Sequence, residues 1–410
     1  MNMIGISRKA WLILLAVFVI MVGYGVLMPI LPFYTERLTA GRLSEGKVNF
    51  HIGLLTASYP LAQMLFVGYW GKLSDRVGRK PLILLGIAGF IVMQLLSGLA
   101  TGLWMFFVAR ILGGILSSGL IPAANAYISD IFPENDRSKA FGLMGSAVST
   151  GIIAGPFLSS FFANNNFHLR LNWFGHYQLD KYSVPFLMTG LAGVLILLAV
   201  ACCLPAGSRK TTLNVTNLQF IKQLPVLKWL FAISLVTQLS VALFESSFSI
   251  YGKKMLGFSS LQLSYGFMIC GVIMAIGQPL VTLIKPRMFS FNKQIISGLI
   301  LSGAMLIILP FTGSIVLVWI VIGLFALGNT FVAPHLSATI TKQDETNIGR
   351  NLGLQTTFNS VGQFIGPLAG SGLLVITYYS PFVFMGVALL AVGIGTFSFK
   401  WSFDQQVFRI

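Results

Sequence analysis

The sequence predicts an all-α integral membrane protein with twelve transmembrane helices arranged in two pseudo-symmetric halves of six. Three observations lead to this fold class: 55% of the 410 residues are hydrophobic, the mean hydropathy is +0.83, and only 9% of the residues are charged. A soluble domain carries about a quarter of its residues as charges. Crossing a bilayer as a helix takes about 20 mostly apolar residues, and this chain reaches that length repeatedly between short polar breaks.

Taken in order, the apolar runs define the expected helices. The first run is too long for a cleaved signal peptide and lacks a small-residue cleavage site after it, so we expect it to remain as the first span. The twelve predicted spans are residues 10–34, 52–71, 81–100, 104–128, 141–163, 184–204, 228–250, 263–284, 294–311, 314–338, 352–377 and 381–401.

The distribution of basic residues predicts the orientation of these spans. Of the 27 Lys and Arg residues, 19 fall on the side of the N-terminus, seven in loops on the other side, and one, Arg110, within a span. Because cytoplasmic loops carry the excess of Lys and Arg, we expect both termini to be cytoplasmic. The same bias explains the net charge of +16 without a basic domain, so no nucleic-acid partner is expected.

Neither metal chemistry nor ATP hydrolysis is expected. Cys202, Cys203 and Cys270 lie within predicted spans without metal-ligand spacing, so we predict no disulfide, metal or cofactor. The phosphate-binding pattern G-x-x-x-x-G-K-[ST] does not occur in the sequence. The chain is therefore expected not to be an enzyme.

The sequence divides into two related parts. Residues 205–227 form the longest polar interruption on the cytoplasmic side, and they separate an N-terminal half, 1–204, from a C-terminal half, 228–410. Five positions recur between the halves at an offset of 211 or 212 residues: Pro122, Gly142, Gly151, Gly155 and Pro156 correspond to Pro334, Gly353, Gly362, Gly366 and Pro367. We therefore expect two parallel halves that are structural repeats.

The charged loop Gly71–Lys80, GKLSDRVGRK, resembles the signature loop between spans 2 and 3 of the major facilitator superfamily of transporters. The resemblance implies the fold of that family and alternating access by rocking of the halves. It also implies that Asp75 lies near the N-terminal end of span 11 and that Arg79 reaches Asp130. The offset of 212 places no matching loop in the second half. A basic loop that only fixes the topology is the alternative.

A second loop completes the predicted cytoplasmic gate. Residues 130–142 resemble the family's R-x-x-A-x-G pattern between spans 4 and 5, although a solvated loop is the alternative interpretation. The predicted gate comprises Gly71, Asp75, Arg76, Gly78, Arg79, Lys80, Asp130 and Arg137.

Span 5 carries a G-x-x-x-G-P element that resembles the antiporter motif of facilitator exporters. Glycines four apart let helices pack closely, and a proline bends the helix because it removes a backbone hydrogen bond. Small-residue packing is also common in all membrane bundles. The predicted hinge and packing positions are Gly151, Gly155 and Pro156, together with Gly362, Gly366 and Pro367 of the second half.

Span 1 resembles the G-x-x-x-P-x-x-P of tetracycline-type and multidrug exporters through Gly25, Pro29 and Pro32. Those exporters often carry an aspartate five residues before the glycine, where this chain has Ile20. The intramembrane charges expected here are instead Arg110 and Glu245, which are expensive in a membrane and therefore candidates for function. Both are expected roughly 8–10 Å below the external surface, in opposite halves.

We predict that Glu245, Arg110 and His335 couple transport to protons. The R-x-x-G-G run that starts at Arg110 resembles the family's conserved-arginine motif, which is linked to proton coupling, and histidine can exchange protons near neutral pH. Each residue has an alternative. Glu245 could contact a cationic substrate or lie at the rim without a role, Arg110 could satisfy carbonyls at the end of a span, and His335 could be neutral and bonded to a helix carbonyl.

The candidate substrate contacts are polar residues midway along the spans. Each could instead form a hydrogen bond between helices. With 34 Phe and 15 Met residues, an apolar cavity is expected. The candidates are Tyr24, Gln63, Asn125, Gln238, Gln278, Asn329, Asn359 and Gln363.

The resulting functional hypothesis is a secondary transporter that exports a small amphipathic organic compound in exchange for protons. By its resemblance, we expect a monomer among the lipids of a bacterial cytoplasmic (inner) membrane. Uptake of a nutrient or siderophore-like solute is the first alternative, and lipid flipping or a non-transporting sensor are others. The external loop 164–183 is longer than most, and could be a surface helix, a lid or a partner site.

Overall fold

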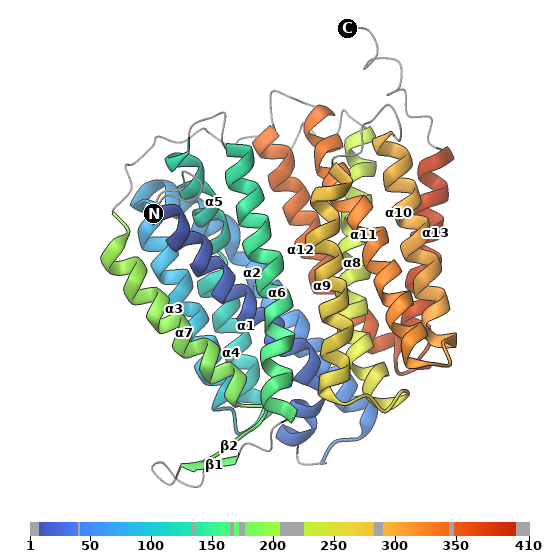
Figure 1. Cartoon of the computed structure of the whole chain (residues 1–410), viewed down its shortest axis with the longest axis horizontal. Coiled ribbons are helices and arrows are strands. Elements are labelled where there is room, and N and C mark those ends of the chain that lie inside the picture. Colours follow the sequence, from blue (N-terminus) through green and yellow to red (C-terminus); the bar gives the residue numbers. More distant parts are fainter. Residues whose placement is uncertain are drawn as a thin grey trace, which may run out of the picture.

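A computed structural model of the chain describes residues 8–39, 42–132, 137–164, 168–171, 177–205, 225–282, 290–343 and 348–398. Nearly all of these residues are helical, which confirms the predicted all-α membrane fold. Figure 1 shows the helices of the first half, in blue to green, beside those of the second half, in yellow to red. Much of the predicted linker 205–227 lies outside the described residues, so the division at these limits stays a prediction.

The helices follow the predicted spans closely. In the first half they are α1 (Arg8–Thr39), α2 (Glu45–Val77), α3 (Arg79–Gly98), α4 (Leu103–Ser117), α5 (Leu120–Ile131), α6 (Arg137–Asn164) and α7 (Val184–Cys203). In the second half they are α8 (Pro225–Lys254), α9 (Ser260–Thr282), α10 (Phe291–Ile308), α11 (Ile315–Gln343), α12 (Ile348–Leu373) and α13 (Ser380–Ser398), with a single 3-10 turn at Leu309–Phe311.

Within the described residues, eleven helical segments are long and apolar enough to cross a membrane. The predicted eleventh span corresponds to α12, which has 26 residues but is not among those eleven. Its sequence between Gln355 and Gln363 is rich in polar side chains. A helix of this kind is tolerated inside a bundle because neighbouring helices shield it from lipid.

The fourth predicted span differs from expectation because it consists of two helices. Helix α4 ends at Ser117 and α5 starts at Leu120, with Ser118 and Gly119 between them. Pro122 lies in the first turn of α5, where a missing backbone N–H leaves no hydrogen bond unmade. The proline thus ends one helix and is accommodated at the start of the next.

The long loop after α6 contains a β-hairpin, which the sequence did not predict. Strands β1 (His168–Leu171) and β2 (Tyr177–Asp180) pair antiparallel, with His168 opposite Asp180. The hairpin lies at the end of the molecule opposite the start of α1 (Figure 1). We call this end, predicted to be external, the hairpin end.

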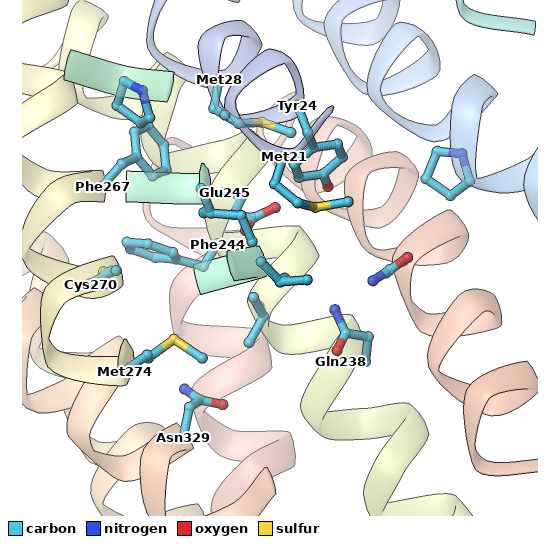
Figure 2. Close-up of a pocket in the computed structure, with 18 of the residues that line it drawn as sticks. Met21, Tyr24, Met28, Gln238, Phe244, Glu245, Phe267, Cys270, Met274 and Asn329 are labelled. Atoms are coloured by element: carbon cyan, nitrogen blue, oxygen red, sulfur yellow. The ribbon is translucent and has the colours of Figure 1, made fainter. Parts of the chain in front are cut away.

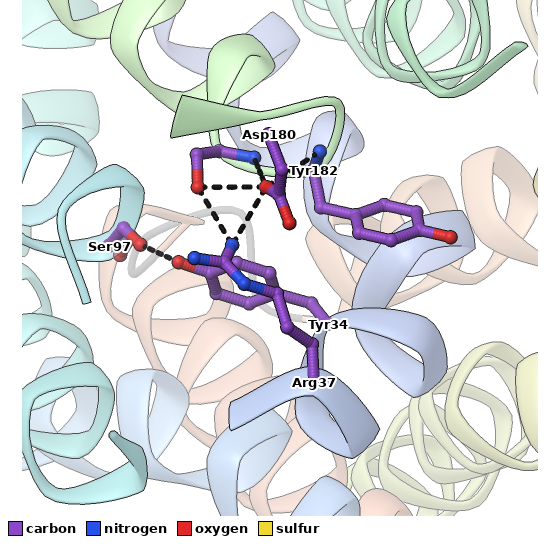
Figure 3. Close-up of polar contacts among 6 residues, drawn as sticks. Tyr34, Arg37, Ser97, Asp180 and Tyr182 are labelled. Carbon is purple, nitrogen blue, oxygen red and sulfur yellow. Dashed lines mark hydrogen bonds and ion pairs between the residues drawn. The ribbon is translucent and has the colours of Figure 1, made fainter. Parts of the chain in front are cut away.

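Arg37 attaches the hairpin to α1, as Figure 3 shows. Its Nη1 donates to Asp180 Oδ1 at 2.7 Å and to Ser183 Oγ at 2.9 Å. Asp180 Oδ1 also accepts the backbone N–H groups of Tyr182 and Ser183, at 3.1 and 3.0 Å, just before α7 begins. The Tyr34 hydroxyl donates to the carbonyl of Ser97 nearby. One carboxylate therefore fixes both the hairpin and the start of α7.

The sequence repeat has a direct counterpart in helix packing. A Cβ added to Gly155 of α6 would lie 2.4 Å from the carbonyl oxygen of Val22 in α1. A Cβ added to Gly366 of α12 would lie 2.8 Å from the carbonyl oxygen of Leu239 in α8. Each half thus packs its fifth long segment against its first through glycines, because a side chain there would collide with backbone.

The two halves share one hydrophobic core at the hairpin end. Leu31 and Tyr34 of α1 belong to the same buried cluster as Phe248 of α8 and Phe382 of α13. A second cluster, which includes Ile13 and Phe90, is confined to the first half. Apolar burial therefore joins the halves at the hairpin end.

Polar contacts reinforce this joint. Lys253 of α8 pairs with Glu36 of α1, and Lys254 lies 3.4 Å from Glu36 and 3.3 Å from Glu45. The Tyr378 hydroxyl donates to Glu45. We call these five residues the hairpin-end cluster. It links the halves through charge as well as through the shared core.

Candidate functional site

A cavity of about 410 Å³ lies between the two halves. Its walls come from α1, α2, α3 and α6 of the first half and from α8, α9, α11 and α12 of the second. Six of the predicted proton-coupling and substrate-binding residues line it, and so does the predicted hinge residue Pro156; the six are Tyr24, Gln63, Gln238, Glu245, Asn329 and Gln363.

Of the described residues that line the cavity, Glu245 alone carries a formal charge. Helix periodicity brings it there, because Gln238, Val241 and Glu245 are spaced by three and four residues and share one face of α8. Ile20, the position at which the resemblance of span 1 led us to look for an acid, also lines the cavity. The acidic group of this site therefore comes from the second half rather than from span 1.

Tyr24 is the polar neighbour of Glu245 in the first half. Figure 2 shows the Glu245 side chain extending toward Tyr24 and Met21. The phenol of Tyr24 is close enough to interact electrostatically with Glu245, Arg110 and Tyr59. The Tyr24 and Tyr59 rings lie 6.5 Å apart between centroids. Tyr24 thus lies near both of the intramembrane charges that the sequence singled out.

Aromatic and sulfur-containing side chains form much of the remaining wall (Figure 2). The Phe244 ring lies 4.8 Å from Phe325 and 6.4 Å from Phe267, measured between centroids. Met21 and Met274 add flexible, polarisable surface. Such walls can pack against an organic compound of varied shape.

Amide groups supply the other polar surface. Gln63 and Gln238 line the cavity from opposite halves, and Asn329 lines it from α11. The Asn329 amide nitrogen donates to the carbonyl of Phe325 at 3.0 Å and lies 3.3 Å from Ser302 Oγ. A few fixed polar groups in an apolar cavity can orient a bound molecule.

The structure does not bring Asn125, Gln278 or Asn359 to the cavity wall. Gln278 lies one turn beyond the lining residue Met274 on α9, and Asn359 lies one turn before Gln363 on α12. Both positions continue a lining face away from the hairpin end. Choosing polar residues midway along each span identified the helix faces that line the cavity, but it predicted a cavity one helical turn longer than the structure shows.

Arg110 and His335 also lie behind the wall rather than in it. The Arg110 guanidinium is buried and lies 5.0 Å from the centre of the Tyr59 ring, which faces the cavity. His335 is buried in α11. Its Nδ1 donates a hydrogen bond to the carbonyl oxygen of Phe331, at 2.9 Å. Proton coupling by these two residues stays a prediction.

The predicted cytoplasmic gate is described only in part. Gly78 joins α2 to α3 with φ of 97°, a left-handed conformation that favours glycine. Arg79 Nη1 donates to Ser74 Oγ at 3.0 Å, and Lys80 Nζ donates to the carbonyl of Ala201 at 2.8 Å. The remaining gate positions lie outside the residues whose side chains are described: Gly71, Asp75, Arg76, Asp130 and Arg137.

Sequence reasoning did not single out several residues that the structure places in the cavity wall or between the halves. Tyr59 and Thr237 line the cavity. Glu36, Glu45 and Lys254 join the halves at the hairpin end. These three charged residues lie just outside the predicted spans, so the sequence did not distinguish them from ordinary loop charges.

Comparisons with known proteins identify the family. The Major Facilitator Superfamily model matches residues 13–344. Multidrug resistance protein 2 of Bacillus subtilis is 28% identical over 396 residues, which cover 95% of this chain and 94% of that protein. Quinolone resistance protein NorA of Staphylococcus aureus is 25% identical over 393 residues, 95% of each chain.

A solved structure shows the same fold. The D-xylose-proton symporter superposes with a TM-score of 0.76 at 17% identity, covering 95% of this chain and 97% of that one. The matched family, the full-length relatives and the shared architecture agree with the signature loop at Gly71–Lys80. The chain belongs to the Major Facilitator Superfamily of membrane transporters.

Proposed function

We propose that this protein exports a small amphipathic organic compound in exchange for protons, with Glu245 as the proton carrier. One observation carries the proposal: Glu245 is the single formally charged side chain among the described residues of a cavity otherwise walled by neutral groups. A carboxylate in such surroundings is costly unless it is protonated or meets a cation. Its charge state can therefore follow the conformation of the halves and the occupancy of the cavity.

The walls support an amphipathic substrate. A cavity of about 410 Å³ falls within the usual range for small-molecule sites. Phe244, Phe267 and Met274 offer apolar contact, while Gln63 and Gln238 offer hydrogen bonds. A compound with an aromatic body and a few polar groups matches this surface.

The relatives support export rather than uptake. Full-length proteins at 24–28% identity are named for multidrug or quinolone resistance. We carry this direction of transport over to the present chain as part of the proposal. The protein would act as a monomer in a bacterial cytoplasmic membrane, with both termini in the cytoplasm.

Alternating access would use the contacts at the hairpin end. Here the shared core, the hairpin-end cluster and a hydrogen bond from Ser249 to Met28 join the halves. This arrangement supports a state that receives substrate from the predicted cytoplasmic side. Release to the outside requires these contacts to separate, while Arg79 and Lys80 take part in closing the opposite end.

The proposal can be tested with purified protein in liposomes and ethidium as a lipophilic probe. Exchange for protons predicts that an acidic lumen drives ethidium accumulation and that a protonophore abolishes it. Accumulation driven by an acidic exterior would instead indicate symport and would contradict the proposal. Equilibration that is independent of the pH gradient would contradict proton coupling altogether.

A further inference from the structure

Pro60 interrupts the backbone hydrogen bonding of α2 beside the cavity. In an α-helix the N–H of residue 60 would donate to the carbonyl oxygen of Thr56, four residues earlier. Proline has no N–H, so this carbonyl loses its partner within the helix. Because Thr56 is buried, an unpaired carbonyl at this position would be costly.

Arg110 of α4 supplies donors at this point. Its Nη2 lies 3.4 Å from the Thr56 carbonyl oxygen, and its Nε donates to the adjacent Leu55 carbonyl at 3.2 Å. The arginine is 3% exposed. A planar guanidinium with several fixed donors can serve two neighbouring carbonyls at once.

The same guanidinium supports Tyr59, the residue before the proline. Its Cζ lies 5.0 Å from the centre of the Tyr59 ring, a distance at which a cation is attracted to an aromatic face. The Tyr59 hydroxyl lies 2.8 Å from Ser117 Oγ, also on α4. Tyr59 and Pro60 both line the cavity.

Gly114 explains how α4 comes close enough to deliver these donors. It lies one turn after Arg110 and so shares its helix face. A Cβ at Gly114 would lie 2.6 Å from the Tyr59 carbonyl oxygen and 2.8 Å from the Ala62 Cβ. In the R-x-x-G-G run, Gly114 thus lets α4 approach α2 closely, and Arg110 can then reach the α2 carbonyls.

We propose that Arg110 is a positioning residue that replaces, at the Thr56 carbonyl, the donor that Pro60 lacks, and so holds Tyr59 in the cavity wall. A guanidinium does not give up its proton in proteins, so Arg110 cannot carry protons itself. Its Nε and Nη2 are directed at α2 carbonyls. The inference goes beyond the proposed function, and rests on it only where transport is the readout.

A double-mutant cycle between positions 60 and 110 tests this without any substrate. Arg110→Met keeps the apolar stem but removes the donors, and Pro60→Ala restores an N–H at position 60. We expect Arg110→Met to lower the melting temperature of the otherwise wild-type purified protein, and to lower it much less when Pro60→Ala is also present. Equal losses with and without Pro60→Ala would overturn the proposal.

Folding failure is also informative. If Arg110→Met gives no folded protein, recovery of folded protein in the double variant of Pro60→Ala and Arg110→Met is itself the rescue. Failure of both variants, with Pro60→Ala alone folded, would overturn the proposal. Arg110→Lys keeps the charge but lacks the planar set of donors, and is expected to retain only part of the stability that Arg110→Met loses.

Transport separates positioning from a direct part in proton exchange. With ethidium as the probe, Arg110→Met is expected to raise KM roughly tenfold, the change that the loss of one charge-assisted hydrogen bond produces. The midpoint of the pH profile should stay at the wild-type value, and Pro60→Ala should restore KM. A shifted midpoint that Pro60→Ala does not restore would overturn positioning. If the wild type does not transport ethidium, the proposed function fails, and the melting cycle still decides the role of Arg110.

Discussion

The Ser249 hydroxyl of α8 lies 3.0 Å from the backbone carbonyl oxygen of Met28 in α1, across the boundary between the halves, and shares its proton between this oxygen and the carbonyl oxygen of Glu245 in its own helix, also at 3.0 Å. That carbonyl is four residues before Pro32, so the missing N–H of the proline leaves it without a partner within α1. A proline of the first half thus creates an acceptor that a serine of the second half uses. This bond must break whenever the halves separate at the hairpin end.

Replacing Ser249 with alanine should therefore favour opening at the hairpin end. Loss of one neutral hydrogen bond is worth about 1 kcal/mol, or roughly fivefold in a two-state equilibrium. The measurement is the rate at which a water-soluble thiol reagent modifies a cysteine introduced in place of Ser371 of α12, a buried side chain of similar size that lies against Gly53 of α2 across the same boundary. Ser240→Ala is the matched control, because Ser240 is buried in α8 and bonds within its own helix. Equal labelling rates in both variants would contradict the assignment.

Tyr378 should contribute to the same closure through its hydrogen bond to Glu45. Burial, followed by the hydrogen bond and charge of Glu45, raises the pKa of Tyr378 to about 12. The neutral phenol is the donor, so the bond is fully present below pH 10, the ordinary pKa, and is lost as the pH rises through about 12. The difference in phenolate absorbance between the wild type and Tyr378→Phe should show this late titration, and a midpoint near 10 would rule the contact out.

The glycine contacts predict a paired effect in the two halves. Gly155→Ala and Gly366→Ala place a Cβ against backbone of α1 and α8, and overpacking of this kind costs about 1–3 kcal/mol. Gly145→Ala on α6 and Gly372→Ala on α12 are matched controls, because a Cβ at either position meets nothing within 4 Å. The melting temperatures of purified Gly155→Ala and Gly366→Ala should lie below those of the two controls. Similar melting temperatures in all four would show that the close approach is not a constraint.

Asp180 should matter more than its ionic partner Arg37. Arg37→Ala removes one partly exposed ion pair, worth about 0.2–1 kcal/mol, and the hydrogen bond from Arg37 to the Ser183 hydroxyl. Asp180→Ala also removes the acceptor for two backbone N–H groups before α7, and a hydrogen bond to a charged group is worth about 1.5–3 kcal/mol. Proteolysis within the hairpin should therefore rise further in Asp180→Ala than in Arg37→Ala. Asp180→Asn, which keeps an acceptor oxygen, should lie between them, and the reverse order would contradict this account.

The sequence predicted well what depends on local pattern. Apolar run length located the helices, and the shared offset of Gly155 and Gly366 predicted equivalent packing in the two halves, which the structure displays. Glu245 and Gln238 were identified because a polar side chain within a membrane span is costly and therefore indicates a functional or packing role. Residue spacing along one helix then placed both on the cavity face.

Contacts between distant segments were not predictable in this way. The position of Pro32 frees the Met28 carbonyl in any α-helix, but nothing local indicates that Ser249 is the donor 221 residues away. Likewise, Thr56 and Arg110 meet because α2 and α4 pack together, not because of their own flanking residues. The hairpin at 168–180 was missed because short strands in a mixed polar and aromatic loop carry a weak signal.

The most direct test of the central claim is proton-driven transport by Glu245→Gln in liposomes. We expect ethidium accumulation driven by an acidic lumen to fall to the level of protein-free liposomes, while exchange of ethidium for ethidium continues. Glu345→Gln removes the same charge between two predicted spans, away from the hairpin-end cluster, and should keep proton-driven accumulation. Full proton-driven accumulation by Glu245→Gln would contradict the role of Glu245 as the proton carrier.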